Sequence, residues 1–478
     1  MPRATGSGVI LRGHGRRWRQ RCLGLLVVCA WAACATDSAP RHLPAPRPSA
    51  PVKSTDRVRA PERPPDVVVV LIDTLRTDHL SLHGYDRPTS PELVAFAQVA
   101  TDYRRAYAQA PWTAPSVASL MTSRYPREVG VRDAPAKLAL ETRTLAAVLR
   151  QHGYRTEAVS TNILISKKYG YDVGFDRFVE LYLSRAPSIP TSRLVTDSAL
   201  SAAREASEAQ PLFLYVHYFD PHYDYLVHPG FRRFEPGLSR EDVILREAAP
   251  FHYLRAKFAR DLDERRMVEA RAYYDSDIEF TDHHVGRLLS GLRGLRRFDN
   301  AVIVIVADHG EEFLDHGEIG HSVALYDELL HVPLLIKAPF QTRGDRQPLP
   351  VALLDVAPTI LDLAGLPPEP THRGASLRTA GPARPIFAST FRPSPKVALV
   401  QGRFKAVLDR DAHDFELFDL LADPHEQHSL ARERPTLAGM LRFQLERWDE
   451  GEFLGTTSTP ATLTEDERAL LRALGYGD

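Results

Sequence analysis

The sequence predicts an α/β domain with a mainly parallel central sheet and helices on both faces, followed by a smaller C-terminal antiparallel subdomain. Two patterns indicate this. Up to about residue 370, continuous apolar runs typical of buried parallel strands alternate with segments of helical length. Beyond that point, short strand-like segments follow one another. A chain of 478 residues, 44% of them hydrophobic, is long enough to bury the large core that this fold requires.

The first elements are clear in the sequence. Residues 66–73, DVVVVLID, form a β-branched run typical of a buried parallel strand. A helix is predicted at residues 90–100 with Ser90 as its N-cap, a second begins near Thr113, and a third spans about residues 142–152. This alternation is the start of an open α/β sheet.

The later elements continue the pattern. Further buried strands are predicted at residues 157–161, 212–219, 301–308 and 332–339. A long helix is expected from about residue 262 to 292. The C-terminal subdomain, residues 371–478, is expected to hold short strands at residues 385–390, 396–408 and 415–420, and then two helices. Residues 66–370 then form the main α/β domain.

The first 36 residues are expected to be a secretory signal peptide. Six arginines and no acid precede Asp37, and the apolar run Cys22–Ala33 is too short to span a bilayer. The sequence Trp-Ala-Ala-Cys resembles a bacterial lipoprotein cleavage box with Cys34 as the lipidated residue. Cleavage after Ala35 is the alternative, and an uncleaved anchor is the third. We therefore expect an exported protein, periplasmic or anchored to a bacterial membrane.

Residues 37–65 contain eight prolines and predict an extended linker. The signal peptide has six basic residues and no acid, and the linker has six basic and three acidic residues. Together these two segments carry a charge of +9. Because the whole chain has a formal net charge of −1, the remaining domain carries −10. Nucleic-acid binding depends on a basic surface, so we expect no nucleic-acid partner. The three cysteines lie within the first 34 residues, which excludes a disulfide or a catalytic thiol in the body.

Polar side chains follow three of the predicted strands. They are Asp73, the segment 217–222 with its two histidines, and Asp308 with His309. Ligands of open α/β sheets bind beyond the carboxyl ends of the strands. Two carboxylates and an imidazole suit Zn²⁺, Mn²⁺ or a related divalent ion. Each residue taken singly would more often be a helix cap or a loop acid, so it is their joint occurrence that predicts a metal site.

Thr113 lies just before a helix whose first turn contains a proline. Its hydroxyl has two interpretations, which are compatible with each other. It is an N-cap, a common role for threonine, or it is a metal-activated nucleophile at a helix N-terminus that favours an anionic substrate.

Residues 113–124 read Thr-Ala-Pro-Ser-Val-Ala-Ser-Leu-Met-Thr-Ser-Arg. This string resembles the signature Cys/Ser-x-Pro-Ser-Arg-x-x-x-(Leu/Met)-Thr-Gly-Arg of the sulfatase family, part of the alkaline-phosphatase superfamily. Further segments resemble that family in order along the body: residues 72–85, 213–222, 306–321, 325–336 and 416–430. The resemblance implies an alkaline-phosphatase-like fold and an ester hydrolase.

Carried over position by position, the resemblance implies two sets of site residues. The implied metal ligands are Asp73, Thr113, Asp308 and His309. The implied catalytic residues are Thr113, His222 and His321, of which the two histidines also bind the substrate, as does His217. We expect one divalent metal ion, Zn²⁺, Mn²⁺, Mg²⁺ or Ca²⁺, and keep a second ion as the alternative. The role of His316 is left open.

The chain departs from the sulfatase pattern in its chemistry. Sulfatases oxidise the signature Cys or Ser to formylglycine, whereas the secondary carbinol of Thr113 would give a ketone. Val117 replaces the arginine that supports formylglycine, and Ser123 replaces the glycine. Thr74 replaces the second of two paired aspartates, and His309 stands where calcium sulfatases usually have Asn.

A Thr nucleophile with Asp, Asp and His ligands resembles the phosphoryl-transferring relatives, which include phosphodiesterases and lipoteichoic-acid-synthase-like enzymes. The sequence therefore predicts an exported, metal-dependent hydrolase that prefers phosphate mono- or diesters of a small molecule, glycan or lipid. Three alternatives remain. They are a sulfuric ester hydrolase that works without formylglycine, a phospho-head-group transferase, and a catalytically inactive binding lipoprotein.

Overall fold

The computed structural model describes residues 63–132, 136–139, 141–182, 191–223, 225, 228, 230–231, 234, 264–379, 384–450 and 460–473. The predicted signal peptide with Cys34, and the linker up to residue 62, lie outside the described residues. Within the described ranges, no helix is long and apolar enough to cross a membrane.

The centre of the domain is a nine-stranded sheet in the order β11-β2-β10-β6-β1-β5-β3-β4, with β9 paired to β2. Five of its strands form a continuous parallel block: β1 (Asp66–Ile72), β3 (Arg155–Ser160), β4 (Arg177–Glu180), β5 (Leu212–Tyr218) and β6 (Ala301–Ala307). β1, β5 and β6 are buried along their whole length, as continuous apolar runs predict. The mainly parallel sheet is thus confirmed.

The other side of the sheet is mixed. It consists of β2 (Thr101–Tyr107), β9 (His331–Val332), β10 (Leu334–Lys337) and β11 (Asp345–Ala352). The predicted strand at 332–339 is β10, which runs antiparallel to β6. The sequence did not reveal β2 or β11 because their polar residues interrupt the apolar runs, and β11 begins exposed and contains prolines.

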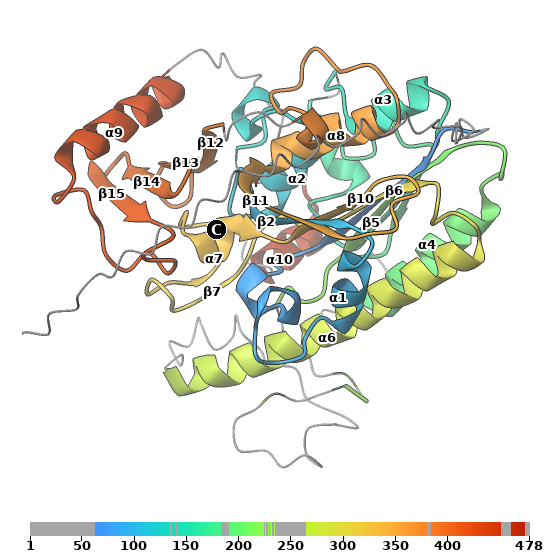
Figure 1. Cartoon of the computed structure of the whole chain (residues 1–478), viewed down its shortest axis with the longest axis horizontal. Coiled ribbons are helices and arrows are strands. Elements are labelled where there is room, and N and C mark those ends of the chain that lie inside the picture. Colours follow the sequence, from blue (N-terminus) through green and yellow to red (C-terminus); the bar gives the residue numbers. More distant parts are fainter. Residues whose placement is uncertain are drawn as a thin grey trace, which may run out of the picture. The chain divides into compact units, whose positions relative to one another are not determined.

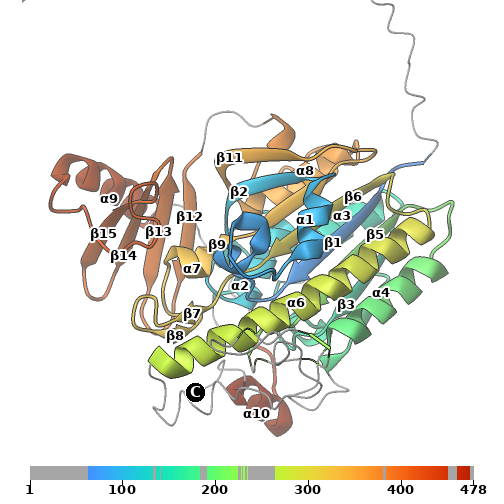
Figure 2. The ribbon, with the colours of Figure 1, turned by 60° about the horizontal axis from the view of Figure 1, so that its bottom comes forward.

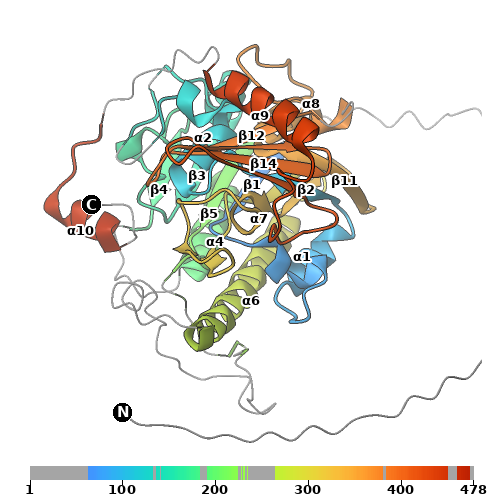
Figure 3. The same cartoon turned by 90° about the vertical axis from the view of Figure 1, so that its left-hand side faces the viewer.

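Helices cover both faces of the sheet (Figures 1 and 3). One group packs together from α1 (Pro91–Ala97), α4 (Ser192–Glu205) and α6 (Glu264–Gly294). The other group contains α2 (Thr113–Thr122), α3 (Leu145–Gln151) and α8 (Val356–Leu363). The long α6, the helix expected at residues 262–292, runs between α1 and α4 in Figure 2 and packs against both.

Of the two predicted helix N-caps, Ser90 is confirmed in position and Thr113 is not. Ser90 holds the N-cap position of α1, but its side chain makes no capping bond. The carboxylate of Asp282, on α6, caps this helix instead by accepting from the backbone N–H groups of Glu92 and Leu93. The N-cap of α2 is Trp112 rather than Thr113, which is the first residue within the helix.

The C-terminal part forms a separate four-stranded antiparallel sheet, as predicted (Figure 1). Its strands are β12 (Ile386–Thr390), β13 (Lys396–Gln401), β14 (Phe404–Asp409) and β15 (Asp414–Asp419). α9 (Pro435–Glu450) packs on β13 and β14 through its own apolar cluster. Three short elements follow β6 in the chain. They are the strands β7 (Glu312–Phe313) and β8 (Ile319–Gly320), which pair as a hairpin, and the helix α7 (Asp327–Leu330). The last described helix is α10 (Glu465–Ala473).

The register of the parallel strands positions the site. Ile72 at the end of β1 is paired with Tyr218 at the end of β5 and with Ala307 at the end of β6. The residues that follow these three strands therefore emerge at one edge of the sheet. This is the edge where open α/β sheets bind their ligands.

Candidate metal and catalytic site

Thr113 begins α2 at the carboxyl edge of the sheet. Its Oγ1 lies 3.4 Å from Asp73 Oδ1 and 3.2 Å from His309 Nε2. His309 Nε2 is in turn 3.6 Å from Asp73 Oδ1 and 3.4 Å from Asp308 Oδ2. All four side chains are completely buried. The structure thus brings together all four residues that the sequence proposed as metal ligands, although they come from three distant segments.

The chemistry of this group fits a divalent cation. Ligand atoms of Asp73, Asp308 and His309 all lie within 4.8 Å of one another. Asp308 Oδ2 is buried and accepts no hydrogen bond from the described residues. Two buried carboxylates at this separation repel each other, and an unpartnered carboxylate oxygen is costly to bury. A divalent ion with oxygen and imidazole ligands would remove both costs.

The two carboxylates have opposite pKa shifts. Burial, with the charge of Asp73 added, raises the pKa of Asp308 to about 6. Burial acts in the same direction on Asp73, but the hydrogen bond of His217 and the nearby charge of His222 outweigh it and hold its pKa well below the usual range. Asp73 is therefore a permanent carboxylate, and a bound cation would also keep Asp308 ionised.

Asn162 and His217 both contact the Oδ2 atom of Asp73. Asn162 Nδ2 donates to Asp73 Oδ2 at 2.7 Å, and His217 Nε2 lies 3.1 Å from the same oxygen. His217 Nδ1 lies 3.2 Å from the hydroxyl oxygen of Tyr215. Both ring nitrogens of His217 therefore face protein groups, so the geometry favours a positioning role over the predicted substrate contact. Asn162 was missed, although it comes directly after the predicted strand 157–161 and is signalled by the same strand-end rule as Asp73.

His222 and His321 lie beside the four ligands. The ring of His321 is centred 4.6 Å from that of His309 and 5.1 Å from that of His222. Burial lowers the pKa of His222 to about 4, and the charge of His321 acts in the same direction. His321 Nδ1 is 3.0 Å from Oε1 of the buried Glu311, which the sequence did not single out.

Asp220 and Thr74 bear on the number of metal ions. Asp220 Oδ2 accepts from the backbone N–H groups of Thr191 and Ser192, so it caps α4 instead of facing the ligands. Thr74, which stands at the second aspartate position of the resemblance, offers only a buried hydroxyl that lacks a hydrogen-bond partner in the described chain. Among the described residues, this arrangement supplies ligands for one ion.

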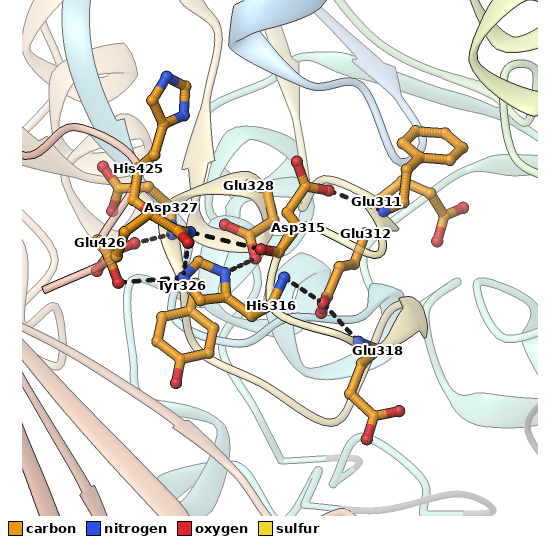
Figure 4. Close-up of polar contacts among 12 residues, drawn as sticks. Glu311, Glu312, Asp315, His316, Glu318, Tyr326, Asp327, Glu328, His425 and Glu426 are labelled. Atoms are coloured by element: carbon orange, nitrogen blue, oxygen red, sulfur yellow. Dashed lines mark hydrogen bonds and ion pairs between the residues drawn. The ribbon is translucent and has the colours of Figure 1, made fainter. Parts of the chain in front are cut away.

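A second group of acidic residues surrounds His316 (Figure 4). We call the hydrogen-bonded network of Glu312, His316, Glu328 and Glu426 the staple around His316. Glu312 Oε1 accepts from the backbone N–H groups of His316 and Glu318, each at 2.9 Å. His316 Nδ1 lies 2.7 Å from Glu328 Oε1, and its Nε2 is 3.2 Å from the carbonyl oxygen of Glu426. Burial alone would lower the pKa of His316, but Glu328 and the Glu426 carbonyl raise it to about 9. A protonated ring that donates from both nitrogens has no lone pair for a metal.

One cavity in the described chain has a lining that does not include Thr113. Its volume is about 650 Å³, and it is lined by Arg76, Asp315 and residues of β2 and of the loop at 420–427. Arg76 is neutralised there by Asp78 and Asp315. None of the four candidate metal ligands lines this cavity.

The chain is similar to known proteins in sequence and in fold. Residues 65–366 match the sulfatase family. A choline-sulfatase of Rhizobium meliloti is 24% identical over 459 residues, covering 81% of this chain and 88% of that protein. Human arylsulfatase K is 26% identical over 198 residues, covering 36% of each chain.

Two solved structures share the fold. The phosphonate monoester hydrolase of Agrobacterium radiobacter superposes with a TM-score of 0.66 at 20% identity, over 84% of this chain and 98% of that one. A protein solved in complex with its substrate D-glucosamine-2-N,6-O-disulfate also gives a TM-score of 0.66, at 19% identity, over 82% and 99% of the two chains. At these identities the likeness shows the fold alone.

Proposed function

The chain belongs to the sulfatase family, and on that premise we propose that it is a divalent-metal-dependent ester hydrolase with Thr113 as its nucleophile and phosphate esters as its preferred substrates. One observation carries the proposal. The Thr113 hydroxyl lies within 3.4 Å of both Asp73 and His309 at the start of α2. An oxygen in this position is both a ligand and a nucleophile candidate.

The buried residues fit a metal that Asp73, Asp308, His309 and Thr113 would hold. Such an ion would favour the alkoxide form of Thr113 and neutralise charge on the phosphoryl oxygens. The positive end of α2, where the N-cap residue Trp112 offers no side-chain cap, also favours an anion.

The side chains then carry out two displacements. In the first, the oxygen of Thr113, as alkoxide, bonds to phosphorus while the bond from phosphorus to the ester oxygen breaks. The departing oxygen takes a proton from an adjacent imidazole, for which His222 and His321 are the candidates. In the second, water attacks phosphorus, gives a proton back to that imidazole, and releases Thr113 and inorganic phosphate. The buried rings of His222 and His321 also restrict water at the site.

The preference for phosphate rests on the residue in the nucleophile position. A formylglycine hydrate can eject sulfate by elimination, and threonine has no such route. A threonine ester must instead be cleaved by direct attack of water on the phosphoryl group, which the imidazoles assist and which a bound divalent ion would favour. Val117, buried in α2, supplies no charge in place of the arginine that accompanies formylglycine.

We further propose that the protein is exported and that Cys34 anchors it through lipid. The support is the arginine-rich leader followed by a short apolar run and the Trp-Ala-Ala-Cys box. The substrate would then be an ester met outside the cytoplasm. Mass spectrometry of the mature N-terminus tests the lipid on Cys34.

The test of the reaction uses 4-nitrophenyl phosphate, bis(4-nitrophenyl) phosphate and 4-nitrophenyl sulfate with Mn²⁺, Zn²⁺ or EDTA. We expect metal-dependent turnover that is faster on a phosphate ester than on the sulfate ester. Thr113→Ala should reduce it by about 10³-fold or more. Thr122→Ala is the matched control, because Thr122 lies at the far end of α2 and bonds only the carbonyl of Ala118 among the contacts described. Sulfate preferred over phosphate would refute the substrate assignment, and full activity of Thr113→Ala would refute the nucleophile.

A further inference from the structure

We propose that Ser116 is a positioning residue, which ties the start of α2 to the backbone of Asp308 and so sets the distance between Thr113 and the metal ligands. This inference rests on the proposed function and adds to it the contact that holds the nucleophile against the metal site. It assigns a role to a buried hydroxyl that neither the ligand set nor the two displacements use.

The hydroxyl of Ser116 makes a short hydrogen bond to the segment that carries two of the candidate metal ligands. Ser116 Oγ donates to the backbone carbonyl oxygen of Asp308 at 2.6 Å, and both residues are wholly buried. The two partners are 192 residues apart in the chain. A buried hydrogen bond between distant segments fixes their separation, because a shift of either segment leaves a buried donor and a buried acceptor unsatisfied.

This contact differs from the usual one of a hydroxyl within a helix. Serine and threonine in helices commonly donate to the carbonyl oxygen four residues earlier. Thr122, at the other end of α2, donates to Ala118 in this way at 2.7 Å, and Thr196 in α4 and Thr359 in α8 make the same type of bond. Ser116 instead directs its hydrogen to another segment, so its contact serves the packing of α2 on the site.

The spacing of the two hydroxyls matches the segment that they contact. Thr113 and Ser116 are three residues apart, so their side chains are neighbours on the surface of α2. Thr113 Oγ1 lies 3.2 Å from His309 Nε2, while Ser116 Oγ holds the preceding residue, Asp308. Two hydroxyls of one helix thus contact two adjacent residues of the ligand segment, and a shift of α2 would disturb both contacts together.

The start of α2 depends on such tertiary contacts. The side chain of its N-cap residue, Trp112, makes no capping hydrogen bond, and Thr113 is the first residue of the helix. Helix ends fray unless their groups find partners. Tyr171 provides a second attachment, since its hydroxyl donates to the carbonyl oxygen of Ala114 at 2.5 Å. Of these two attachments, that of Ser116 leads directly to a candidate metal ligand.

The contact bears on the metal as well as on the nucleophile. The backbone N–H of Thr74 donates to Asp308 Oδ1 at 3.4 Å, and Ser116 holds the carbonyl of the same residue. These contacts orient Asp308 so that its Oδ2, which accepts no hydrogen bond from the described residues, is the oxygen available to a cation. Loss of the Ser116 hydroxyl should therefore loosen Asp308 and Thr113 relative to each other.

The test measures metal affinity and needs no substrate. Isothermal titration calorimetry of Mn²⁺ or Zn²⁺ into the metal-free protein compares the wild type with Ser116→Ala. We expect the affinity to fall about 10- to 100-fold, as it does when other contacts that orient ligands are removed. Alanine is a better helix former than serine, so a weaker helix would not account for the loss. Wild-type affinity in Ser116→Ala would overturn the proposal.

Ser119→Ala is the matched control. Ser119 lies one turn further along α2, is equally buried, and its hydroxyl lacks a hydrogen-bond partner among the described residues. The control should bind the metal as the wild type does. An equal loss of affinity in Ser119→Ala would overturn the proposal, because the effect would then belong to any buried hydroxyl of α2.

A double-mutant cycle separates positioning from a merely structural contact. If Ser116 acts by holding Thr113 at the metal, Ser116→Ala should cost much less affinity in the Thr113→Ala background than in the wild type. A merely structural contact would weaken both backgrounds equally. Additive losses would therefore overturn the inference.

The outcomes distinguish this inference from the proposed function. At saturating metal, we expect kcat for 4-nitrophenyl phosphate to fall by about 10-fold or more in Ser116→Ala, because a small misplacement of a nucleophile is costly. Absence of Thr113-dependent turnover in the metal-loaded wild type contradicts the proposed function. Wild-type affinity in Ser116→Ala, or additive losses in the cycle, contradicts this inference alone.

Discussion

At the scale of single residues, the site depends on how Asp73 is oriented. Its Oδ2 is hydrogen-bonded by Asn162 and lies within reach of His217, while its Oδ1 faces Thr113 and His309. The sequence identified Asp73 and His309 because each follows an apolar strand. It identified Thr113 because this residue precedes a helix whose first turn contains a proline, and the family resemblance then implied that all three are metal ligands. It did not identify Asn162, although that residue directly follows a predicted strand, and its hydrogen bond to Asp73, 89 residues away in the chain, is seen only in the structure.

Replacing Asn162 by Ala should weaken metal binding. The substitution removes the donor that fixes Asp73 Oδ2, and loss of such a supporting contact typically costs 10- to 100-fold in metal affinity. Isothermal titration calorimetry measures the metal affinity, with Mn²⁺ or Zn²⁺ added to protein from which a chelator has removed bound metal. Thr161→Val is the control, because the neighbouring Thr161 donates to the carbonyl of His217 and not to Asp73. Wild-type affinity in Asn162→Ala would show that the contact does not support the ligand.

At the scale of elements, the strand ends and α2 were predictable and the staple around His316 was not. The apolar runs of β1, β5 and β6 fix where Asp73, Asp308 and the histidines emerge. The staple instead joins the hairpin β7–β8, α7 and the loop at Glu426, whose hydrogen bonds follow no sequence period. His316 was therefore left open by the sequence, and its contacts indicate a structural role.

The stabilising effect of His316 should depend on pH. Its pKa in the folded protein is about 9, above the ordinary value of about 6.5. The contribution is therefore complete below about pH 6.5 and is lost as the pH rises through about 9. We expect His316→Gln to lower Tm by about 2–4 °C near pH 6 and by much less near pH 10.

Thermal unfolding of wild type and variant at several pH values checks this sign. His425→Gln is the control, since His425 is an exposed histidine in the loop beside the staple. A Tm difference for His316→Gln that grows with pH would contradict a stabilising imidazolium. A constant difference would indicate that only the packing of His316 on Tyr326 matters.

At the scale of the whole molecule, the sequence predicted the fold class and the family. It did not predict all the strands of the central sheet. The parallel block, the helices on both faces and the C-terminal antiparallel sheet were predicted because each leaves an apolar or capping pattern in the chain. The antiparallel direction of β10 and the strands β2 and β11 were not predicted. Strand direction depends on tertiary pairing, and the pairs that β2 makes with β10 and β11 join residues more than 200 positions apart. Family membership shows that the chain is an ester hydrolase, while the proposed preference for phosphate rests on Thr113 and Val117.

The central claim is that the oxygen of Thr113 becomes bonded to phosphorus during turnover. The most direct measurement is acid quenching of the metal-loaded enzyme within a single turnover of a phosphate ester, followed by peptide mass spectrometry. We predict phosphothreonine at Thr113 in the wild type, and no phosphorylated peptide and no turnover in Thr113→Ala. Turnover of the phosphate ester by Thr113→Ala at the wild-type rate would contradict the claim.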